Sequence, residues 1–336
     1  MSDRRRGAVD FPALRNQRQV EAGICQTTLR NRIGCAGVGL HSGQQVRFTV
    51  FPAPADSGIT FRRIDLLEAG LSGDQDISVP ARFDNISSTQ LGSTLTNAAG
   101  VSVATVEHLM SAFAGCGIDN ARVDLDGAEL PVLDGSAAPF VMLLECAGVA
   151  SLAEPRMYIR ILETIGVEED GKRASLSPFE GSAFNFKIDF ASAIIGRQSY
   201  AYEAGPGKFR NEIASARTFG FLHEVEHLKS LGLARGGSLQ NAIVLDGDAI
   251  LNEGGLRFPD EFVRHKILDA IGDMYLAGTP IMGRFEGVRA GHGLNNKLLR
   301  ALFDTPRAWE YAQGPMGAPR QTQERALPKI RRAARG

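Results

Sequence analysis

The alternation of apolar and polar residues along the chain predicts a series of short strands. In Gln45–Phe51, the apolar residues Val46, Phe48 and Val50 alternate with other side chains, as expected for a strand with one buried face. Further strands are expected at Thr27–Val38, Ala121–Leu125, Tyr158–Val167, Phe184–Phe190 and Ala242–Leu245.

Helical signals occur between these strands. Thr105 is a candidate N-cap for a helix over Val106–Ala114, which glycines then end. Ser136 is expected to cap a second helix with the body Phe140–Cys146. Two more helices are expected late in the chain, at Glu261–Ala277 and Asn295–Leu302.

The order of these elements favours an α+β fold. The segment Gly148–Arg156 lacks periodicity and contains a proline, so we expect a domain boundary there. On each side, strands are followed by helices, an order that predicts α+β sandwiches and not a doubly wound sheet. The expected divisions are a basic tail at 1–21, α+β domains at 22–150 and 155–311, and a basic tail at 312–336.

Composition narrows the class of protein. The 336 residues are 43% apolar and 22% charged, which is typical of a globular chain, and the net charge of -1 gives no argument for nucleic-acid binding. No apolar run follows the first arginines, as a signal peptide requires, and no stretch of about 18 apolar residues could span a membrane. Four scattered cysteines predict reduced, mostly buried thiols and a cytoplasmic protein.

Both ends of the chain are rich in arginine and poor in large apolar residues, so they are expected to be disordered. Their charge could make a weak contact with anionic lipid headgroups. A solvated tail is the favoured interpretation.

Three polar side chains share one face of the predicted helix Glu261–Ala277. His265, Asp269 and Asp273 follow one another at intervals of four residues. A histidine and an aspartate at this spacing can hold one zinc ion, and a neighbouring carboxylate can orient a ring. A solvated or ion-paired helix face explains the same pattern.

Two other segments carry residues that suit metal chemistry. Glu107 and His108 are adjacent in the first half, so both could border one cavity while only His108 binds a metal and Glu107 serves as a base. His223 and His227 belong to the pentapeptide His-Glu-Val-Glu-His, which matches the H-E-x-x-H pattern of zinc proteases. By pattern alone, the H-E-x-x-H match is more specific than the pair His265 and Asp269.

Several blocks of sequence closely resemble one family, the UDP-3-O-acyl-N-acetylglucosamine deacetylases. The resemblance runs in one order from about Gln26 to about Tyr311 and leaves out both tails. The blocks that carry it are Gly37–Gly43, Ala104–Leu109, Gly117–Asn120, Leu133–Phe140, Ala216–Gly220, Phe262–Asp273 and Gly291–Lys297.

The resemblance implies a fold and an active site. The fold would be two similar two-layer α/β sandwich domains with the active site at their interface. The reaction would be zinc-dependent removal of the acetyl group from a UDP-linked acylated amino-sugar, on the way to lipid A. The implied roles are Zn2+ ligands for His108, His265 and Asp269; a general base for Glu107; a cation for His292, with Asp273 holding its ring; and oxyanion binding for Thr218.

Substrate binding is implied for other positions. Lys266 would meet the nucleotide diphosphate, Phe219 would contact the substrate, and the segment 193–214 would wall the passage for the acyl chain. The H-E-x-x-H match falls where the family has a surface helix, and the stripe Leu222, Val225 and Leu228 would leave both histidines solvated. We expect a monomer.

Two other functions compete with this interpretation. One is a zinc protease built on His223 and His227. The other is a protein without enzymatic activity, whose basic tails bind membrane or nucleic acid.

Overall fold

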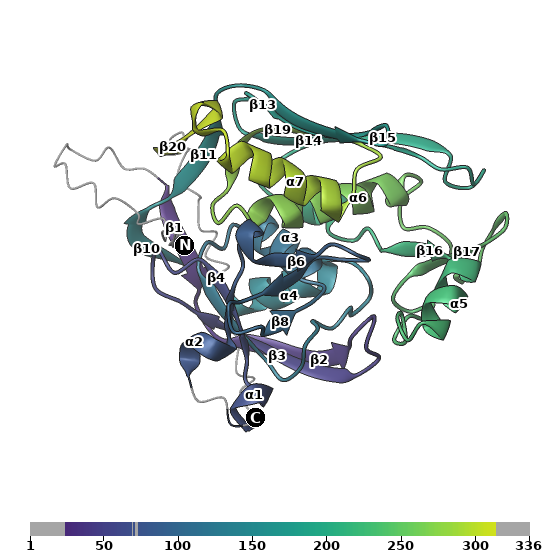
Figure 1. Ribbon diagram of the computed structural model, residues 1–336, viewed down its shortest axis with the longest axis horizontal. Helices are drawn as coiled ribbons and strands as arrows, with labels where there is room; N and C mark the ends of the chain where they lie inside the picture. The colour runs from purple at the N-terminus through teal and green to yellow at the C-terminus, as the bar shows by residue number, and fades with distance from the viewer. Residues whose placement is uncertain (1–23, 69, 71–72, 314–336) are drawn as a thin grey trace, which may run out of the picture.

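The computed structural model describes residues 24–68, 70 and 73–313 and has the α+β architecture predicted from the sequence. Figure 1 shows a sheet on each outer side of the molecule, with the helices α3, α6 and α7 between the sheets. Except for Ala312 and Gln313, the two predicted tails lie outside the described residues.

The N-terminal half contributes a sheet with the strand order β2-β3-β9-β4-β5. In β3, Val46, Phe48 and Val50 are buried, which confirms the predicted alternation. The ring of Phe48 meets that of Phe140 in α4 at a centroid distance of 5.7 Å. The bounds are β2 Ile33–Val38, β3 Gln45–Pro52, β4 Ile59–Arg63, β5 Ser78–Pro80, β9 Ala121–Leu125, α3 Glu107–Cys116 and α4 Ala138–Ala147.

Smaller elements complete this half. The strands β6, β7 and β8 form an antiparallel sheet of their own, and β1 pairs with β10. Their bounds are β1 Cys25–Leu29, β6 Ile86–Ser88, β7 Thr94–Thr96, β8 Ser102–Val103 and β10 Val149–Pro155. The short helices are α1 Asp65–Glu68, α2 Asp74–Ile77 and the 3-10 turn Phe83–Asn85.

The C-terminal half contributes a larger sheet, in which β19 pairs with β11, β13 and β14. The helices α6 and α7 lie on one face of this sheet (Figure 1). The bounds are β11 Met157–Ile161, β12 Ile165–Glu169, β13 Lys172–Ser177, β14 Ser182–Asp189, β15 Arg197–Glu203, β19 Ile281–Val288, β20 Trp309–Gln313, α6 Glu261–Tyr275, α7 His292–Phe303, the π-helical turn Phe209–Ile213 and the 3-10 turn Pro306–Ala308.

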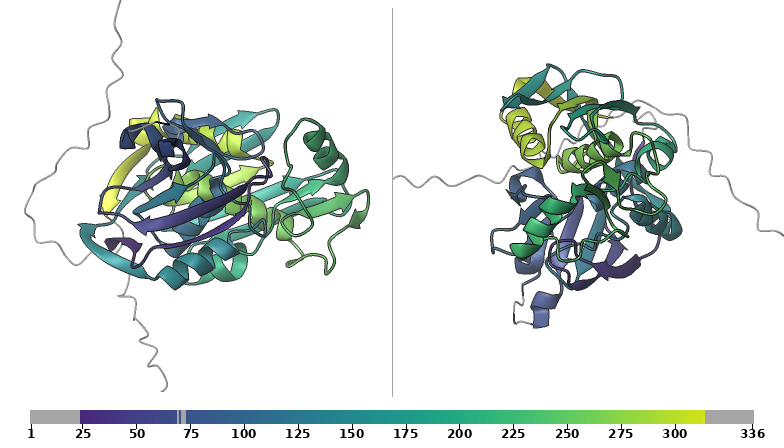
Figure 2. Two further views of the ribbon diagram at one scale, coloured as in Figure 1. Left: turned by 90° about the horizontal axis from the view of Figure 1, so that it is seen from below. Right: turned by 90° about the vertical axis from the view of Figure 1, so that its right-hand side faces the viewer.

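A small sheet with its own helix projects from one end of the molecule (Figures 1 and 2). We call the residues 219–251 the α5 unit. Its strands pair in the order β16-β17-β18, and α5 packs beside them. The bounds are β16 Phe219–Phe221, α5 Leu222–Ser230, β17 Ile243–Asp246 and β18 Ala249–Ile250.

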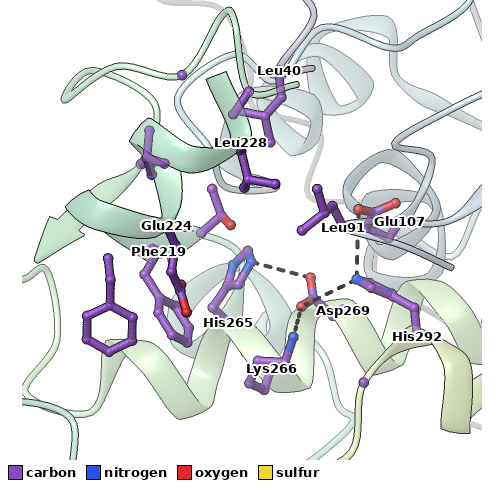
Figure 3. Close-up of a pocket in the computed structure, with 18 of the residues that line it drawn as sticks. Leu40, Leu91, Glu107, Phe219, Glu224, Leu228, His265, Lys266, Asp269 and His292 are labelled. Carbon is purple, nitrogen blue, oxygen red and sulfur yellow. Dashed lines mark hydrogen bonds and ion pairs between the residues drawn. The ribbon is translucent and has the colours of Figure 1, made fainter. Parts of the chain in front are cut away.

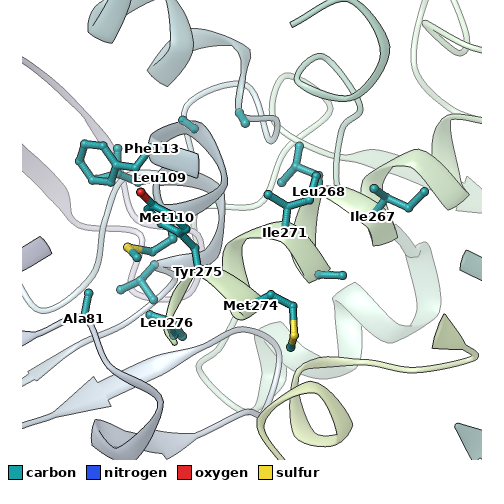
Figure 4. Close-up of a cluster of buried hydrophobic side chains, with 14 of the residues drawn as sticks. Ala81, Leu109, Met110, Phe113, Ile267, Leu268, Ile271, Met274, Tyr275 and Leu276 are labelled. Carbon is teal, nitrogen blue, oxygen red and sulfur yellow. The ribbon is translucent and has the colours of Figure 1, made fainter. Parts of the chain in front are cut away.

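The two halves share one continuous cluster of buried apolar side chains. Figure 4 shows Leu109, Met110 and Phe113 of α3 beside Ile271 and Met274 of α6. The division into domains at 22–150 and 155–311 stays a prediction.

Two expectations about the extent of strands are corrected. The segment Thr27–Val38 forms two strands with different partners, since β1 pairs with β10 and β2 pairs with β3. The segment expected at Tyr158–Val167 is likewise divided into β11 and β12. The expected boundary at Gly148–Arg156 contains the strand β10, whose partner β1 lies more than a hundred residues earlier, so no local pattern reveals it.

The helix caps also differ from the prediction. Thr105 does not cap α3: its backbone has φ +58°, and its hydroxyl donates to the buried carboxylate of Glu129 at 3.2 Å. Ser136 does accept the N–H of Ala138, the first residue of α4, at 3.2 Å. The expectation that the four cysteines are mostly buried is wrong, since three are partly exposed and Cys146 is exposed.

No helix within the described part of the chain has both the length and the apolar character needed to cross a bilayer.

The close packing of α3 on α6 generates a stability prediction at Gly272. A Cβ atom there would lie 2.1 Å from the backbone oxygen of Glu107, so the two helices would have to separate. Gly272→Ala is expected to lower the free energy of unfolding by about 2 kcal/mol, although the same change usually stabilises a helix. Urea denaturation measures this loss.

Gly293→Ala in α7 is the matched control. Its added Cβ would meet only the side-chain hydroxyl of Thr89, at 3.3 Å, which can move away. We expect its free energy of unfolding to stay within about 0.5 kcal/mol of the original. Equal losses in both variants would contradict the prediction.

Candidate active site

The first turn of α3 carries Glu107 and His108, which are 4% and 5% exposed. Adjacent helical residues point about 100° apart, so the two side chains face different neighbours. The Nε2 atom of His108 lies 3.7 Å from Oδ1 of Asp269, and Oε1 of Glu107 lies 4.0 Å from Nε2 of His292. Both residues line one cavity.

One face of α6 carries His265, Asp269 and Asp273, as the four-residue spacing predicts. The three side chains are only 3%, 4% and 2% exposed, so the alternative of a solvated helix face is wrong. Burial of so many ionisable groups requires partners for them.

His108, His265 and Asp269 together have the geometry of a metal site. Their candidate ligand atoms lie within 4.8 Å of one another, and Nε2 of His265 is 3.4 Å from Oδ1 of Asp269. The two imidazole rings meet edge to face at a centroid distance of 5.1 Å. Among the described residues, Oδ1 of Asp269 has no hydrogen-bond partner although it is buried.

Protonation states at this cluster also suit a cation. Burial lowers the pKa of His265 to about 4, against the opposing attraction of Asp269, so its ring is neutral near pH 7. Its Nδ1–H donates to the carbonyl of Ala216 at 3.1 Å, which leaves the lone pair of Nε2 directed at the cluster. Two histidines and one carboxylate are a ligand set that zinc accepts.

Asp269 stays ionised despite its burial. Burial alone would raise the pKa of Asp269, but the neighbouring imidazoles and the Lys266 ammonium, 2.6 Å from Oδ2, hold it well below its usual range. One carboxylate oxygen thus pairs with Lys266, and the other is left for the metal cluster.

A second cluster surrounds His292, the first residue of α7. Its Nδ1 lies 2.8 Å from Oδ2 of Asp273, which also accepts the amide of Asn295 at 2.9 Å. The hydroxyl of Ser93 donates to the other oxygen of Asp273 at 2.7 Å, and the N–H of Ser93 donates to Glu107 at 3.0 Å. Ser93 therefore joins the two carboxylates of this cluster.

The carboxylates around His292 favour its charged form. Burial alone would lower the pKa of His292, but Asp273, Glu107 and Asp269 outweigh that effect and raise it to about 9. At pH 7 the site therefore presents an imidazolium, whose Nε2 lies 4.0 Å from Oε1 of Glu107. Figure 3 shows His292 directed at Glu107 and Asp269.

These groups form the polar floor of a cavity of about 900 Å3. Thr218 and Phe219, expected at the site, both line it, whereas Asp273 lies behind His292. Above the floor, the α5 unit supplies an apolar wall, with Phe219 and Leu228 visible in Figure 3. The wall residues are Phe219, Phe221, Leu222, Val225, Leu228, Leu239, Val244 and Leu251.

The segment 193–214 does not wall this cavity, so that expectation is wrong. Within the described chain, none of its residues lines the cavity. Phe209 and Ile213 are instead buried in the shared apolar core, and Tyr200 stacks under Arg264 at 3.9 Å. The apolar wall comes from the following segment, the α5 unit.

Lys266 lines the cavity and is partly buried. Its ammonium pairs with Asp269, and this attraction outweighs burial and raises the pKa of Lys266. The lysine is therefore charged, and its role toward a diphosphate stays a prediction.

Sequence reasoning missed Ser93 and Asn295 as members of the site. Asn295 lies in the block Gly291–Lys297, which resembles the family, but the resemblance assigned it no role. Ser93 lies 180 residues from Asp273 in the sequence, so no spacing could reveal their contact.

The H-E-x-x-H segment forms α5, as a surface helix. His223 and His227 are exposed, and Leu222, Val225 and Leu228 face inward to different degrees, as the stripe predicts. In the part of the chain that the structure describes, neither histidine belongs to a group of three metal ligands.

Comparison with known proteins agrees with this geometry. Residues 26–304 match the model of the family described as LpxC, UDP-3-O-acyl N-acetylglycosamine deacetylase. Proteins named UDP-3-O-acyl-N-acetylglucosamine deacetylase are similar over most of the chain. That of Chromobacterium violaceum is 48% identical over 300 residues, covering 88% of this chain and 96% of the relative.

Two further relatives carry the same name. The protein of Phenylobacterium zucineum is 53% identical over 274 residues, covering 82% of this chain and 92% of its own. That of Hahella chejuensis is 49% identical over 289 residues, covering 85% and 93%. With a family match over most of its length, the chain belongs to the UDP-3-O-acyl-N-acetylglucosamine deacetylase family.

Proposed function

We propose that the protein hydrolyses the N-acetyl group of a UDP-3-O-(3-hydroxyacyl)-N-acetylglucosamine, releasing acetate in an early step of lipid A biosynthesis. The observation that carries the proposal is the meeting of a His/His/Asp cluster, the Glu107 carboxylate and a charged histidine in one cavity. Membership of the deacetylase family supports the substrate class.

His108, His265 and Asp269 would hold a zinc ion. Three protein ligands leave a coordination position open, which distinguishes catalytic from structural zinc sites. Bound there, zinc would polarise the acetyl carbonyl and lower the pKa of a water molecule.

The side chains around the cluster supply the proton transfers. Glu107 is the general base, which takes a proton from the attacking water. Protonated His292 and the Thr218 hydroxyl stabilise the negative charge that develops on the carbonyl oxygen. The departing amine takes a proton from Glu107 or from His292, and Asp273 keeps the His292 ring oriented and charged.

The remainder of the cavity suits the remainder of the substrate. The apolar wall of the α5 unit, including Phe219, would receive the acyl chain. Lys266 would contact the diphosphate as a point charge. We further propose that the enzyme acts in the cytoplasm as a monomer.

Substitution of single residues separates the proposed metal site from the zinc-protease alternative. Zinc content, measured on purified protein, is expected to be one ion per chain and to fall in His265→Ala together with acetate release. His227→Ala on the exposed helix α5 is the matched control and should keep both. Loss of zinc in His227→Ala and not in His265→Ala would contradict the proposed site.

Glu107→Gln tests the base without removing a ligand. We expect it to retain zinc but to lower kcat by about a hundredfold, because general base catalysis typically contributes 10²–10⁴-fold.

The pH dependence of kcat/KM tests the role of His292. The required form is the imidazolium, so activity should fall as the pH rises through about 9, the value to which its surroundings raise its pKa. Asp273→Asn removes the largest cause of that raised pKa and should move the basic limb to lower pH. A basic limb unchanged in both Asp273→Asn and His292→Ala would mean that His292 is not the required cation.

Lys266→Ala tests diphosphate binding. Contact with the diphosphate is similar in the ground and transition states, so the variant should mainly raise KM. Initial rates over a range of substrate concentrations separate the two parameters. Loss of kcat at unchanged KM would instead assign Lys266 to the support of Asp269.

A further inference from the structure

Two side chains on successive turns of α6 hold the same backbone peptide, the one that joins Ala216 to Arg217. The Nδ1–H of His265 donates to the carbonyl of Ala216 at 3.1 Å. The N–H of Arg217 donates to Oε1 of Glu261 at 3.0 Å. The carbonyl and N–H of a trans peptide point in opposite directions, so this single unit bridges positions four residues apart on one helix face.

Glu261 is itself held in place by a dense set of donors. Its side chain is fully buried, and its carboxylate also accepts from Nε and Nη2 of Arg217 at 2.8 and 3.2 Å. The N–H of Arg257 donates to the second oxygen at 2.5 Å. Arg217 is 9% exposed and is tied in turn to the carbonyl of Gly255 at 2.8 Å. The carboxylate therefore has one fixed orientation at the start of α6.

We propose that Glu261 is a positioning residue for His265, acting through the Ala216–Arg217 peptide, with Arg217 as its counter-charge. The inference rests on the metal site proposed above. A carboxylate that accepts the peptide N–H polarises the peptide, so its carbonyl becomes a better acceptor for the imidazole. The ring is then fixed with its proton on Nδ1 and with Nε2 directed at Asp269, 3.4 Å away.

The metal-facing nitrogen depends on this arrangement. An imidazole whose Nδ1–H lost its acceptor could rotate or exchange tautomers, and either change removes a ligand lone pair from the cluster. Loss of the hydrogen-bond partner of a ligating histidine typically lowers metal affinity by about 10–100-fold. A comparable effect is expected for Glu261, although it touches neither the metal cluster nor the cavity.

A general loss of stability must be separated from a loss of positioning, because Arg217 and Glu261 form a buried ion pair. The chain offers a matched pair in Arg156 and Asp119. Their Nε and Oδ1 atoms are 2.7 Å apart, and Asp119 also accepts a backbone N–H, that of Thr27, at 2.8 Å. Asp119 follows the C-terminal end of α3, whereas His108 lies in the first turn of that helix.

The experiment compares Glu261→Gln with Asp119→Asn. Both variants should lower the melting temperature, because each leaves an arginine that is largely removed from solvent without its charged partner. Titration of each protein with zinc alone, in competition with a chelator, gives the dissociation constant. Glu261→Gln should raise it by about tenfold or more, and Asp119→Asn should leave it within about twofold.

A second measurement uses the metal-free proteins. The Nδ1–H proton of His265, observed by NMR, should be protected from exchange in the original protein and in Asp119→Asn. In Glu261→Gln it should exchange rapidly or disappear. Unchanged zinc affinity or an unchanged proton signal in Glu261→Gln would overturn the proposal, as would equal changes in the control.

Two further arrangements keep the test decisive. If the original protein binds no zinc, the proposed metal site fails, and the imidazole proton alone decides whether Glu261 positions His265. If Glu261→Gln does not fold, the double variant Glu261→Gln/Arg217→Met removes both charges, a change that buried ion pairs often tolerate. Its control is Asp119→Asn/Arg156→Met, with the same expected difference.

Discussion

The contact between α3 and α6 determines where charge can be buried in this molecule. At Gly272 of α6 the two helices approach so closely that no side chain would fit between this residue and the backbone of Glu107 in α3. This contact brings His108 of α3 within 3.7 Å of Asp269 of α6, while apolar residues of both helices join the core. The His/His/Asp cluster needs both helices, because His108 comes from α3 whereas His265 and Asp269 come from α6.

The buried charges are balanced in an ordered way. Asp269 has Lys266, Asp273 has His292, and Glu107 accepts a backbone N–H from Ser93. Each carboxylate thereby has a cation or a hydrogen-bond donor beside it, as the burial of a charged group requires. His292 faces three carboxylates at once, so removal of Asp273, Glu107 or Asp269 would lower the pKa of His292.

The sequence predicts those parts of the fold and of the site whose signal is local. The alternation in β3 and the four-residue spacing in α6 are local, so they gave the buried face of one strand and the common face of His265, Asp269 and Asp273. The strand β10 and the role of Ser93 depend on partners more than a hundred residues away, which periodicity cannot supply. The resemblance to a family assigned the cluster residues but misplaced the apolar wall by one segment.

The α5 unit has a consequence for how such an enzyme can diversify. It begins directly after Thr218. Backbone hydrogen bonds attach it to the N-terminal half: the N–H groups of Arg235 and Gly236 donate to the carbonyls of His41 and Leu40, respectively. Side chains do not make these ties. Exchange of Leu222, Val225 and Leu228, the half-buried wall residues of α5, would therefore leave these backbone ties in place. Related proteins could thus differ in the length and width of the apolar group that the cavity binds, while the residues of the polar floor stay the same.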